Sequence, residues 1–347
     1  MRKHIRLYLI ALSASAVAVT ACGGGNGRAA ATTDEATTTR AAFAKGADVS
    51  WLTQIESEGG IFRNALGQEK ECMRLLKEDC GVNSIRLRVW VNPADGWNNI
   101  DDVALKAQRA HSLGLRLMID FHFSDTWADP GAQKTPAAWA DYDMAQLKAA
   151  VAEHVTKTLT KLSDLGIEPE WVQIGNETRT GFLYPLGASS NGQNFTDLVN
   201  SAYDAIKAVF PQATAIVHLD CGDKADIYTY IFDILKEYGG EYDMIGMSLY
   251  PQADSWQATA EACMANIKSV AATYGKPVML CEIGMDYREA EQCNQCIAYL
   301  MEQGQASGCL EGIFYWEPEA PPGYNHGYNK GCFVGGAPTQ ALDAFKD

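Results

Sequence analysis

The stretch ALKAQRAHSLGLRLMIDFHF, residues 104–123, contains the unit on which the fold is built. Its first half has apolar residues at helical spacing, and its second half is a continuous apolar run of the kind that forms a buried parallel strand. Gly114 stands between the halves, where a helix can end in a left-handed residue before the next strand. Leu165-Gly166-Ile167 repeats this junction later in the chain. The unit therefore predicts helices that alternate with parallel strands.

The same alternation continues from about residue 47 onward without a low-complexity linker. Short apolar runs predict eight strands, at 47–50, 84–91, 116–123, 170–175, 215–219, 244–249, 277–281 and 312–316. Amphipathic segments predict the helices between them, at 68–79, 100–113, 144–165, 195–210, 225–237, 258–274 and 290–307. Eight such strands in one domain favour a closed (β/α)8 barrel, the TIM barrel. The alternative is an open doubly wound sheet, but no Gly-x-Gly-x-x-Gly follows the first strand.

The N-terminal segment has the composition of an export signal followed by a tether. A basic start precedes an apolar run at 7–19, which is too short to span a membrane. Val19-Thr20-Ala21-Cys22 resembles a bacterial lipobox with Cys22 as the lipidated residue, and an ordinary signal peptide is the alternative. We expect a lipoprotein signal peptide at 1–21, a flexible tether at 22–40 and one barrel domain at 41–347. The protein is then exported and lipid-anchored to the bacterial membrane, at the outer membrane or cell surface.

The charge of the chain excludes one class of partner. Its 43 acidic and 28 basic residues give a formal net charge of −15. Such a charge repels the phosphates of nucleic acids, so we expect no nucleic-acid partner.

Ten cysteines are present, and lipidation of Cys22 would leave nine. Export permits disulfides, but sequence does not determine which residues pair. Cys293-x-x-Cys296 has no second close pair, so structural cysteines are favoured over a zinc site.

Two of the predicted strands end in glutamate. The run at 171–177 ends in Asn176-Glu177, and the run at 277–282 ends in Glu282. Because the active site of a (β/α)8 barrel lies at the C-terminal ends of its strands, both carboxyls should face the mouth of the barrel. Hydrolysis of a glycosidic bond needs such a pair, one to protonate the departing oxygen and one to attack the anomeric carbon. We predict Glu177 as general acid/base and Glu282 as nucleophile, against the alternative of two unrelated exposed glutamates.

Other strand ends carry polar and aromatic side chains. Alternation places Arg86, Arg88 and Trp90 on one face of the second strand, and buried arginines need anionic partners. Asp120 and His122 alternate inward on the third strand, either as a structural pair or as substrate contacts. Flat rings that suit sugar faces are expected at the rim, from Trp90, Trp97, Trp127, Trp139, Tyr250 and Trp316.

These residues resemble glycoside hydrolase family 53, the endo-β-1,4-galactanases, whose clan has its catalytic glutamates after strands four and seven. The matching motifs are GADVS (46–50), RLRVWVNP (86–93), DFHFSDTWADP (120–130), QIGNE (173–177), IGMSLYP (245–251) and FYWEP (314–318). They span nearly the whole chain after the tether. The third motif is long and is specific to this family rather than to the clan.

The resemblance implies a retaining, endo-acting hydrolase of the β-1,4-galactan in pectic arabinogalactan side chains, working through a covalent glycosyl-enzyme intermediate. The Glu177 pKa should be raised and the Glu282 pKa lowered, with the carboxyls about 5–5.5 Å apart. Arg88 and Tyr250 are assigned to keeping Glu282 ionised. Asn176 is assigned to the sugar 2-hydroxyl, and Asp125 and Trp127 to recognition of galactose. The other expected supporting residues are Asp48, Trp90, His122 and Trp316.

The resemblance also leaves alternatives. Some family members carry calcium in a long loop after strand seven, but the short segment 283–288 gathers no set of oxygen ligands, so we expect neither calcium nor another cofactor. We expect a monomer. A mannanase or xylanase of the same clan would share both glutamates. A glycan-binding surface lipoprotein without activity is a third possibility, against which the intact pair of glutamates argues.

Overall fold

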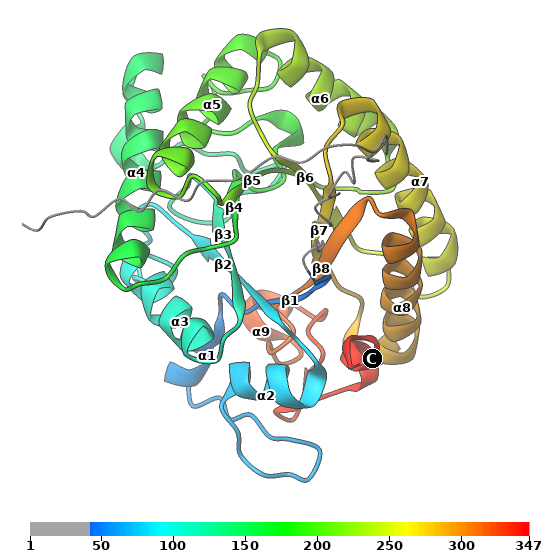
Figure 1. Ribbon diagram of the computed structural model, residues 1–347. Helices are drawn as coiled ribbons and strands as arrows, with labels where there is room; N and C mark the ends of the chain where they lie inside the picture. Colours follow the sequence, from blue (N-terminus) through cyan, green and yellow to red (C-terminus); the bar gives the residue numbers. More distant parts are fainter. Residues whose placement is uncertain (1–41, 347) are drawn as a thin grey trace, which may run out of the picture. The chain divides into compact units, whose positions relative to one another are not determined.

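The computed structural model describes residues 42–346, which form a closed barrel of eight parallel strands (Figure 1). Neighbouring strands follow the order of the chain, and pairing of β1 with β8 closes the ring. The strands are β1 Ala44–Asp48, β2 Ser84–Val89, β3 Arg116–Phe121, β4 Trp171–Ile174, β5 Thr214–Leu219, β6 Met244–Leu249, β7 Val278–Ile283 and β8 Leu310–Trp316. The predicted (β/α)8 barrel is confirmed.

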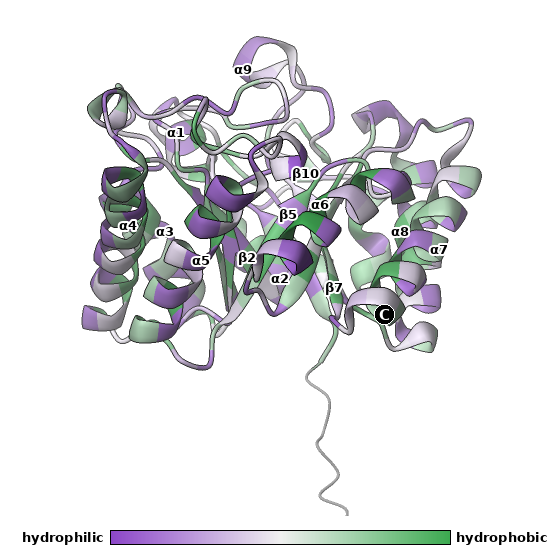
Figure 2. Cartoon of the chain, turned by 90° about the horizontal axis from the view of Figure 1, so that it is seen from above, coloured by the Kyte–Doolittle hydropathy of each residue, from purple (hydrophilic) through white to green (hydrophobic). Residues whose placement is uncertain are grey.

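Helices surround the barrel and turn their apolar sides toward the strands (Figure 2). They are α1 Leu52–Ser57, α2 Cys72–Cys80, α3 Ile100–Ser112, α4 Met144–Asp164, α5 Gly192–Val209, α6 Ala225–Tyr238, α7 Trp256–Tyr274 and α8 Ala290–Ser307. A short helix without buried residues, α9 Tyr324–Gly327, follows β8. Gly114 has a φ of 68°, the left-handed conformation expected just after α3. The longest helix, α4, begins with a reciprocal capping box between Asp143 and Gln146.

The interior of the barrel has an apolar layer and a polar layer. A compact cluster fills the lower part, with members that include Met118, Trp171 and Ile216. Two residues further along the same strands lie Asp120, Gln173 and His218, which are all fully buried. Because side chains two residues apart face the same side of a strand, the barrel interior changes from an apolar floor to a polar layer toward its C-terminal end.

Two details of the strands differ from the sequence-based expectation. β1 ends at Asp48 because the Asp48 carboxylate accepts hydrogen bonds from the backbone N–H and the hydroxyl of Ser50, at 3.0 and 2.5 Å. Strict alternation with Glu282 would place Cys281 between barrel and helix, but it packs in the interior apolar cluster. The reason is a register shift between β6 and β7, which changes the alternation just before Glu282.

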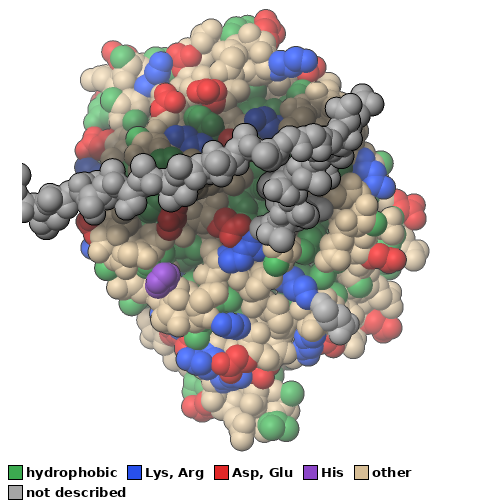
Figure 3. Space-filling view, in the orientation of Figure 1, with side chains coloured by type: hydrophobic (Ala, Val, Ile, Leu, Met, Phe, Trp, Pro, Cys, Tyr) green, Lys and Arg blue, Asp and Glu red, His purple; other side chains and the backbone are tan. Residues whose placement is uncertain are grey.

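Several predictions concern segments or groups outside the barrel interior. The signal peptide, the lipidation site Cys22 and the tether lie outside the described residues. Within residues 42–346, no helix is long and apolar enough to cross a membrane, and all nine cysteines are free thiols. Acidic and basic side chains are interspersed over the face shown in Figure 3.

Candidate active site

A cavity of about 380 Å³ at the C-terminal ends of the strands contains both predicted glutamates. Glu177 follows β4, and Glu282 lies within β7. The residues that line the cavity are His122, Trp127, Ala128, Asp129, Asn176, Glu177, Tyr250, Glu282, Trp316, Tyr328 and Lys330. Seven of the side chains predicted from sequence thus meet around one space, and they are His122, Trp127, Asn176, Glu177, Tyr250, Glu282 and Trp316.

The backbone before Glu177 turns sharply out of β4. Gly175 and Glu177 both have left-handed conformations, with φ values of 73° and 48°. For a residue with a side chain this conformation costs roughly 1–3 kcal/mol and persists only where surrounding contacts impose it. A Cβ at Gly175 would lie 2.5 Å from Thr178 Cγ2, so glycine is needed for the turn. The strained turn places the Glu177 carboxyl in the cavity.

Arg86 on β2 is the centre of the buried polar layer. Its guanidinium donates to Asp48 at 2.6 Å, to Asp120 at 2.9 Å and to Asn176 at 3.0 Å. It also forms an ion pair with Glu282 at 3.0 Å, and its side chain is 1% exposed. A guanidinium presents five N–H donors in one plane, which lets it hold several carboxylates at once.

Two groups favour the ionised form of Glu282. The Arg86 guanidinium contacts one carboxylate oxygen, and the Tyr250 hydroxyl donates to the other at 2.7 Å. Burial nevertheless raises the pKa of Glu282 above its ordinary value, and Arg86 and Tyr250 only partly oppose it. The expected lowering of the Glu282 pKa is therefore wrong, because the interior removes more hydration energy than these two partners replace.

Among residues 42–346, no cationic side chain pairs with Glu177. Burial, followed by the neighbouring charge of Glu282, raises the pKa of Glu177 to about 8, against a weaker opposing hydrogen bond with Ser248. The two carboxyls titrate as a coupled pair. Since only Glu282 contacts a guanidinium, we assign the remaining proton of the pair to Glu177. Near neutral pH the cavity then holds one protonated carboxyl and one carboxylate.

Arg88 does not contact Glu282, and its predicted role at the nucleophile is wrong. Its guanidinium forms a buried ion pair with Glu317, and it lies 4.4 Å from the ring centre of Trp127. Arg88 is two residues nearer the end of β2 than Arg86, so it meets the segment that follows β8 instead of β7. The guanidinium beside Glu282 belongs to Arg86.

Three other predicted residues do not line the cavity. Asp48 binds Arg86 deep in the barrel. Trp90 donates from its indole N–H to His122 Nδ1 at 3.2 Å, and so helps to orient a residue that does line the cavity. Asp125, expected to recognise galactose, accepts hydrogen bonds from the backbone N–H groups of Asn92 and Ala137 at 3.0 and 2.8 Å. It therefore fixes loops and does not line the cavity.

Some residues of the site were not predicted from sequence. His218 connects Asn176 and Ser248 through contacts of 3.0 and 2.8 Å, and burial followed by the Arg86 charge lowers its pKa well below the ordinary value. It is therefore a neutral link between the two sides of the site. Tyr328 and Lys330 reach the cavity from the segment after β8.

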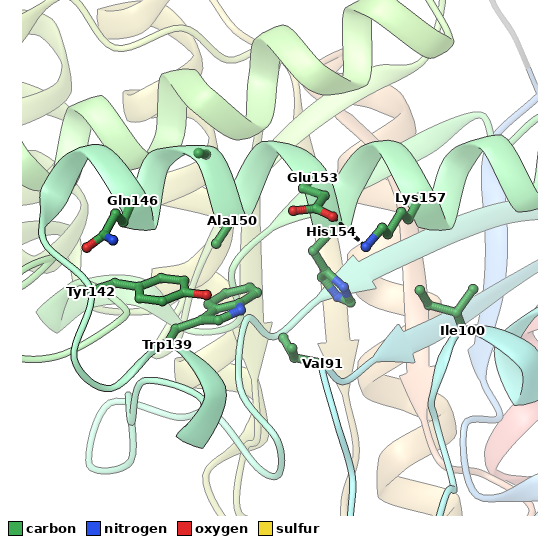
Figure 4. Close-up of a pocket in the computed structure, with 10 residues that line it drawn as sticks. Val91, Ile100, Trp139, Tyr142, Gln146, Ala150, Glu153, His154 and Lys157 are labelled. Carbon is green, nitrogen blue, oxygen red and sulfur yellow. Dashed lines mark ion pairs between the residues drawn. The ribbon is translucent and has the colours of Figure 1, made fainter.

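A further hollow, of about 440 Å³, lies on the flank of the barrel beside α4 (Figure 4). Its one carboxyl group, from Glu153, is paired with Lys157 at 2.5 Å. Trp139, expected at the rim of the active site, lines this hollow instead. The hollow lacks a second carboxyl, so it cannot perform the paired-carboxyl hydrolysis expected of the cavity at the barrel mouth.

Within residues 42–346, no cluster of three or more His, Cys, Asp or Glu side chains is arranged to hold a metal ion.

We expect Arg86→Met to lower the free energy of unfolding at pH 7 by about 3–5 kcal/mol, because it leaves buried carboxylates without a counter-charge. Chemical denaturation measures the change. Arg74→Met is the matched control, since it removes the same charge from an exposed surface pair with Glu78 and should leave stability nearly unchanged. Equal stability of the two variants would show that Arg86 does not hold the polar layer together.

The chain matches known proteins along most of its length. The model of glycosyl hydrolase family 53 matches residues 44–309. The chain is 36% identical over 297 residues to the arabinogalactan endo-β-1,4-galactanase of Humicola insolens, covering 79% of this chain and 89% of that protein. It is 32% identical over 307 residues to the endo-β-1,4-galactanase of Bacillus subtilis, covering 80% of this chain and 70% of that protein.

A solved structure agrees with these matches. A solved structure of a fungal β-1,4-galactanase superimposes with a TM-score of 0.81 at 32% identity, covering 87% of this chain and 98% of the fungal chain. The matched region contains nearly the whole barrel and both glutamates of the cavity. The chain therefore belongs to glycosyl hydrolase family 53.

Proposed function

We propose that the chain is an endo-acting β-1,4-galactanase that cleaves the galactan of pectic arabinogalactan side chains with retention of configuration. The observation that carries this proposal is the pair of carboxyls in one cavity, a buried one contacted by Arg86 and a half-buried one with a pKa of about 8. The relatives that are named galactanases support the choice of sugar.

In the first step, Glu177 donates its proton to the oxygen of the leaving sugar as the bond to the anomeric carbon breaks. The Glu282 carboxylate attacks that carbon from the other side and forms the glycosyl-enzyme. Arg86 and Tyr250 hold the Glu282 oxygens in place, at 3.0 and 2.7 Å. Because these contacts exist before substrate binds, the nucleophile needs no rearrangement during the reaction.

In the second step, Glu177 takes a proton from water, the water oxygen attacks the anomeric carbon, and the bond to Glu282 breaks. The change of role has an electrostatic cause. The negative charge of Glu282 helps to keep Glu177 protonated, and that charge disappears while Glu282 is esterified. The Glu177 pKa then falls, so the carboxylate becomes available as a base when water must be activated.

The walls of the cavity suit an uncharged sugar. Trp316 and Tyr328 meet nearly at right angles, with ring centres 5.0 Å apart, and they line the cavity together with Trp127. Aromatic faces bury the apolar side of a pyranose ring, while the side-chain amide of Asn176 lies in the same cavity beside its hydroxyls.

The full chain should release galactooligosaccharides from linear β-1,4-galactan and leave β-mannan and xylan intact. Sizing the products over time tests both the sugar and the mode of attack, because internal cleavage gives long fragments before short ones. Faster hydrolysis of mannan or xylan would make it another glycanase of the clan. Galactan binding without any cleavage would contradict an enzymatic function.

Azide can separate the two carboxyl roles. We expect Glu282→Ala to reduce turnover of an aryl β-galactobioside to background, and azide to restore it with an α-galactosyl azide as product, since azide enters from the side of the missing nucleophile. Glu177→Ala should lose about 10²–10⁴-fold on galactan, and azide should give the β-azide. NMR of the products distinguishes the two. Exchanged stereochemistry would reverse the assignment.

The pH profile should reflect the Glu177 proton. Activity requires protonated Glu177, so kcat/KM on galactan should fall as pH rises through about 8. An aryl galactobioside with a nitrophenolate leaving group needs little proton donation and should lose this alkaline limb. Identical profiles for both substrates would assign the limb to another group.

We further propose that the mature protein is an exported monomer attached to the membrane through lipidated Cys22, with residues 22–40 as its tether. The lipobox-like sequence before Cys22 supports this proposal. Labelling with radioactive palmitate should mark the natural chain and not Cys22→Ser, and equal labelling would refute it.

A further inference from the structure

A second cavity, of about 430 Å³, adjoins the catalytic cavity at Glu177. Glu177 and Tyr250 line both cavities, whereas Glu282 lines only the first. The wall of the second cavity carries polar groups from the segments after β5 and β6, among them Asp220, Asp223 and Gln252. Glu177 therefore lies between two adjoining cavities.

The roles of the two glutamates determine which part of the substrate occupies each cavity. The sugar whose anomeric carbon is attacked must contact Glu282, so it lies in the first cavity. The oxygen that departs must contact Glu177, because that residue supplies its proton. The leaving portion of the chain then extends past Glu177 into the second cavity.

Asp220, which lines the second cavity, has one carboxylate oxygen in contact with neighbours and one oxygen without a partner among the described residues. It directly follows β5 and is 9% exposed. Its Oδ2 atom lies 3.1 Å from the Cys221 thiol, which donates to it, and 3.4 Å from Arg179. Its other oxygen, Oδ1, is buried without a hydrogen-bond partner among the described residues. An unsatisfied buried carboxylate oxygen is costly, and sites that bind ligands or ordered water are where such groups are found.

Resting on the proposed function, we propose that the Asp220 carboxylate accepts a hydrogen bond from a hydroxyl of the leaving galactose unit, directly or through one water. A sugar hydroxyl is a neutral donor, so it can bind this carboxylate without adding charge. The Arg179 guanidinium already compensates part of the Asp220 charge, which favours a neutral ligand over a cation. Asp220 is thus a specificity residue for the leaving side of the site.

The same contact has a consequence for the second half of the reaction. A sugar held by Asp220 can replace water as acceptor of the glycosyl-enzyme. Its hydroxyl oxygen then forms a bond to the anomeric carbon, the bond from that carbon to Glu282 breaks, and Glu177 takes the hydroxyl proton. The product is a longer oligosaccharide. Asp220 should therefore determine how the intermediate divides between transfer to sugar and hydrolysis.

The test uses the full chain and the variants Asp220→Ala and Asp220→Asn, the second of which keeps the shape of the side chain. Rates are measured at pH 5, where Glu177 stays protonated, on linear galactan and on a nitrophenyl β-galactobioside. The ratio of transfer to hydrolysis is measured with added galactobiose. We expect Asp220→Ala to lower kcat/KM on galactan and the transfer ratio by about 10–100-fold, and the aryl substrate rate by less than about twofold. Asp220→Asn should show the same selective loss at smaller size.

Asp254→Ala is the matched control. Asp254 is an exposed acid that lines a neighbouring cavity without Glu177, so none of the three measurements should change. Equal losses on galactan and the aryl substrate would overturn the proposal, because Asp220 would then act through Glu177 or the fold. Unchanged transfer in both Asp220 variants would also overturn it. A natural chain that does not cleave galactan would instead refute the proposed function.

Discussion

Carboxylates from β1, β3 and β7 converge on one guanidinium inside the barrel, that of Arg86. None of them could remain ionised there alone, because transfer of a carboxylate from water to the interior costs more than the protein can supply without a counter-charge. Arg86 can serve all three because its donors are fixed in a plane and it cannot lose its proton. The position of the nucleophile, the orientation of Asn176 and the closure of the polar layer over the apolar floor all depend on this side chain.

The two glutamates of the cavity differ in the neighbours that set their protonation. Arg86 and Tyr250 contact Glu282, whereas Glu177 has a strained backbone and pairs with no cation among the described residues. The difference in partners assigns the shared proton to Glu177, and the charge of Glu282 strengthens that assignment. One carboxylate thus sets the protonation of the other. Glu177 can change from acid to base without another group, since esterification of Glu282 removes the charge that kept Glu177 protonated.

The sequence predicted the barrel, the eight strands and both glutamates. An apolar run that ends in a polar residue indicates a parallel strand whose C-terminal end faces the barrel mouth. The sequence also placed Arg86 and Arg88 on one face of β2. It did not predict which carboxylate each arginine meets, since that depends on how β2 stands relative to β7 and β8 across the closed ring. The contacts of Asp125 were not predicted for a related reason, because its partners are backbone N–H groups of loops whose paths have no periodic pattern. Tyr328 reaches the cavity only through the segment after β8.

The charges around Arg88, the second arginine of β2, are balanced differently from those around Arg86. Arg88 pairs with Glu317, beside which lies a second buried carboxyl, that of Glu319. Burial, followed by the charge of Glu317, raises the pKa of Glu319 well above its ordinary value, so its carboxyl stays protonated. Burial also raises the pKa of Glu317 to about 7, despite the contact with Arg88. A retained proton here takes the place of a second cation. The formal charge of −15 counts these acids and Glu177 as ionised, so it overstates the negative charge at the mouth of the barrel, where an uncharged sugar would bind.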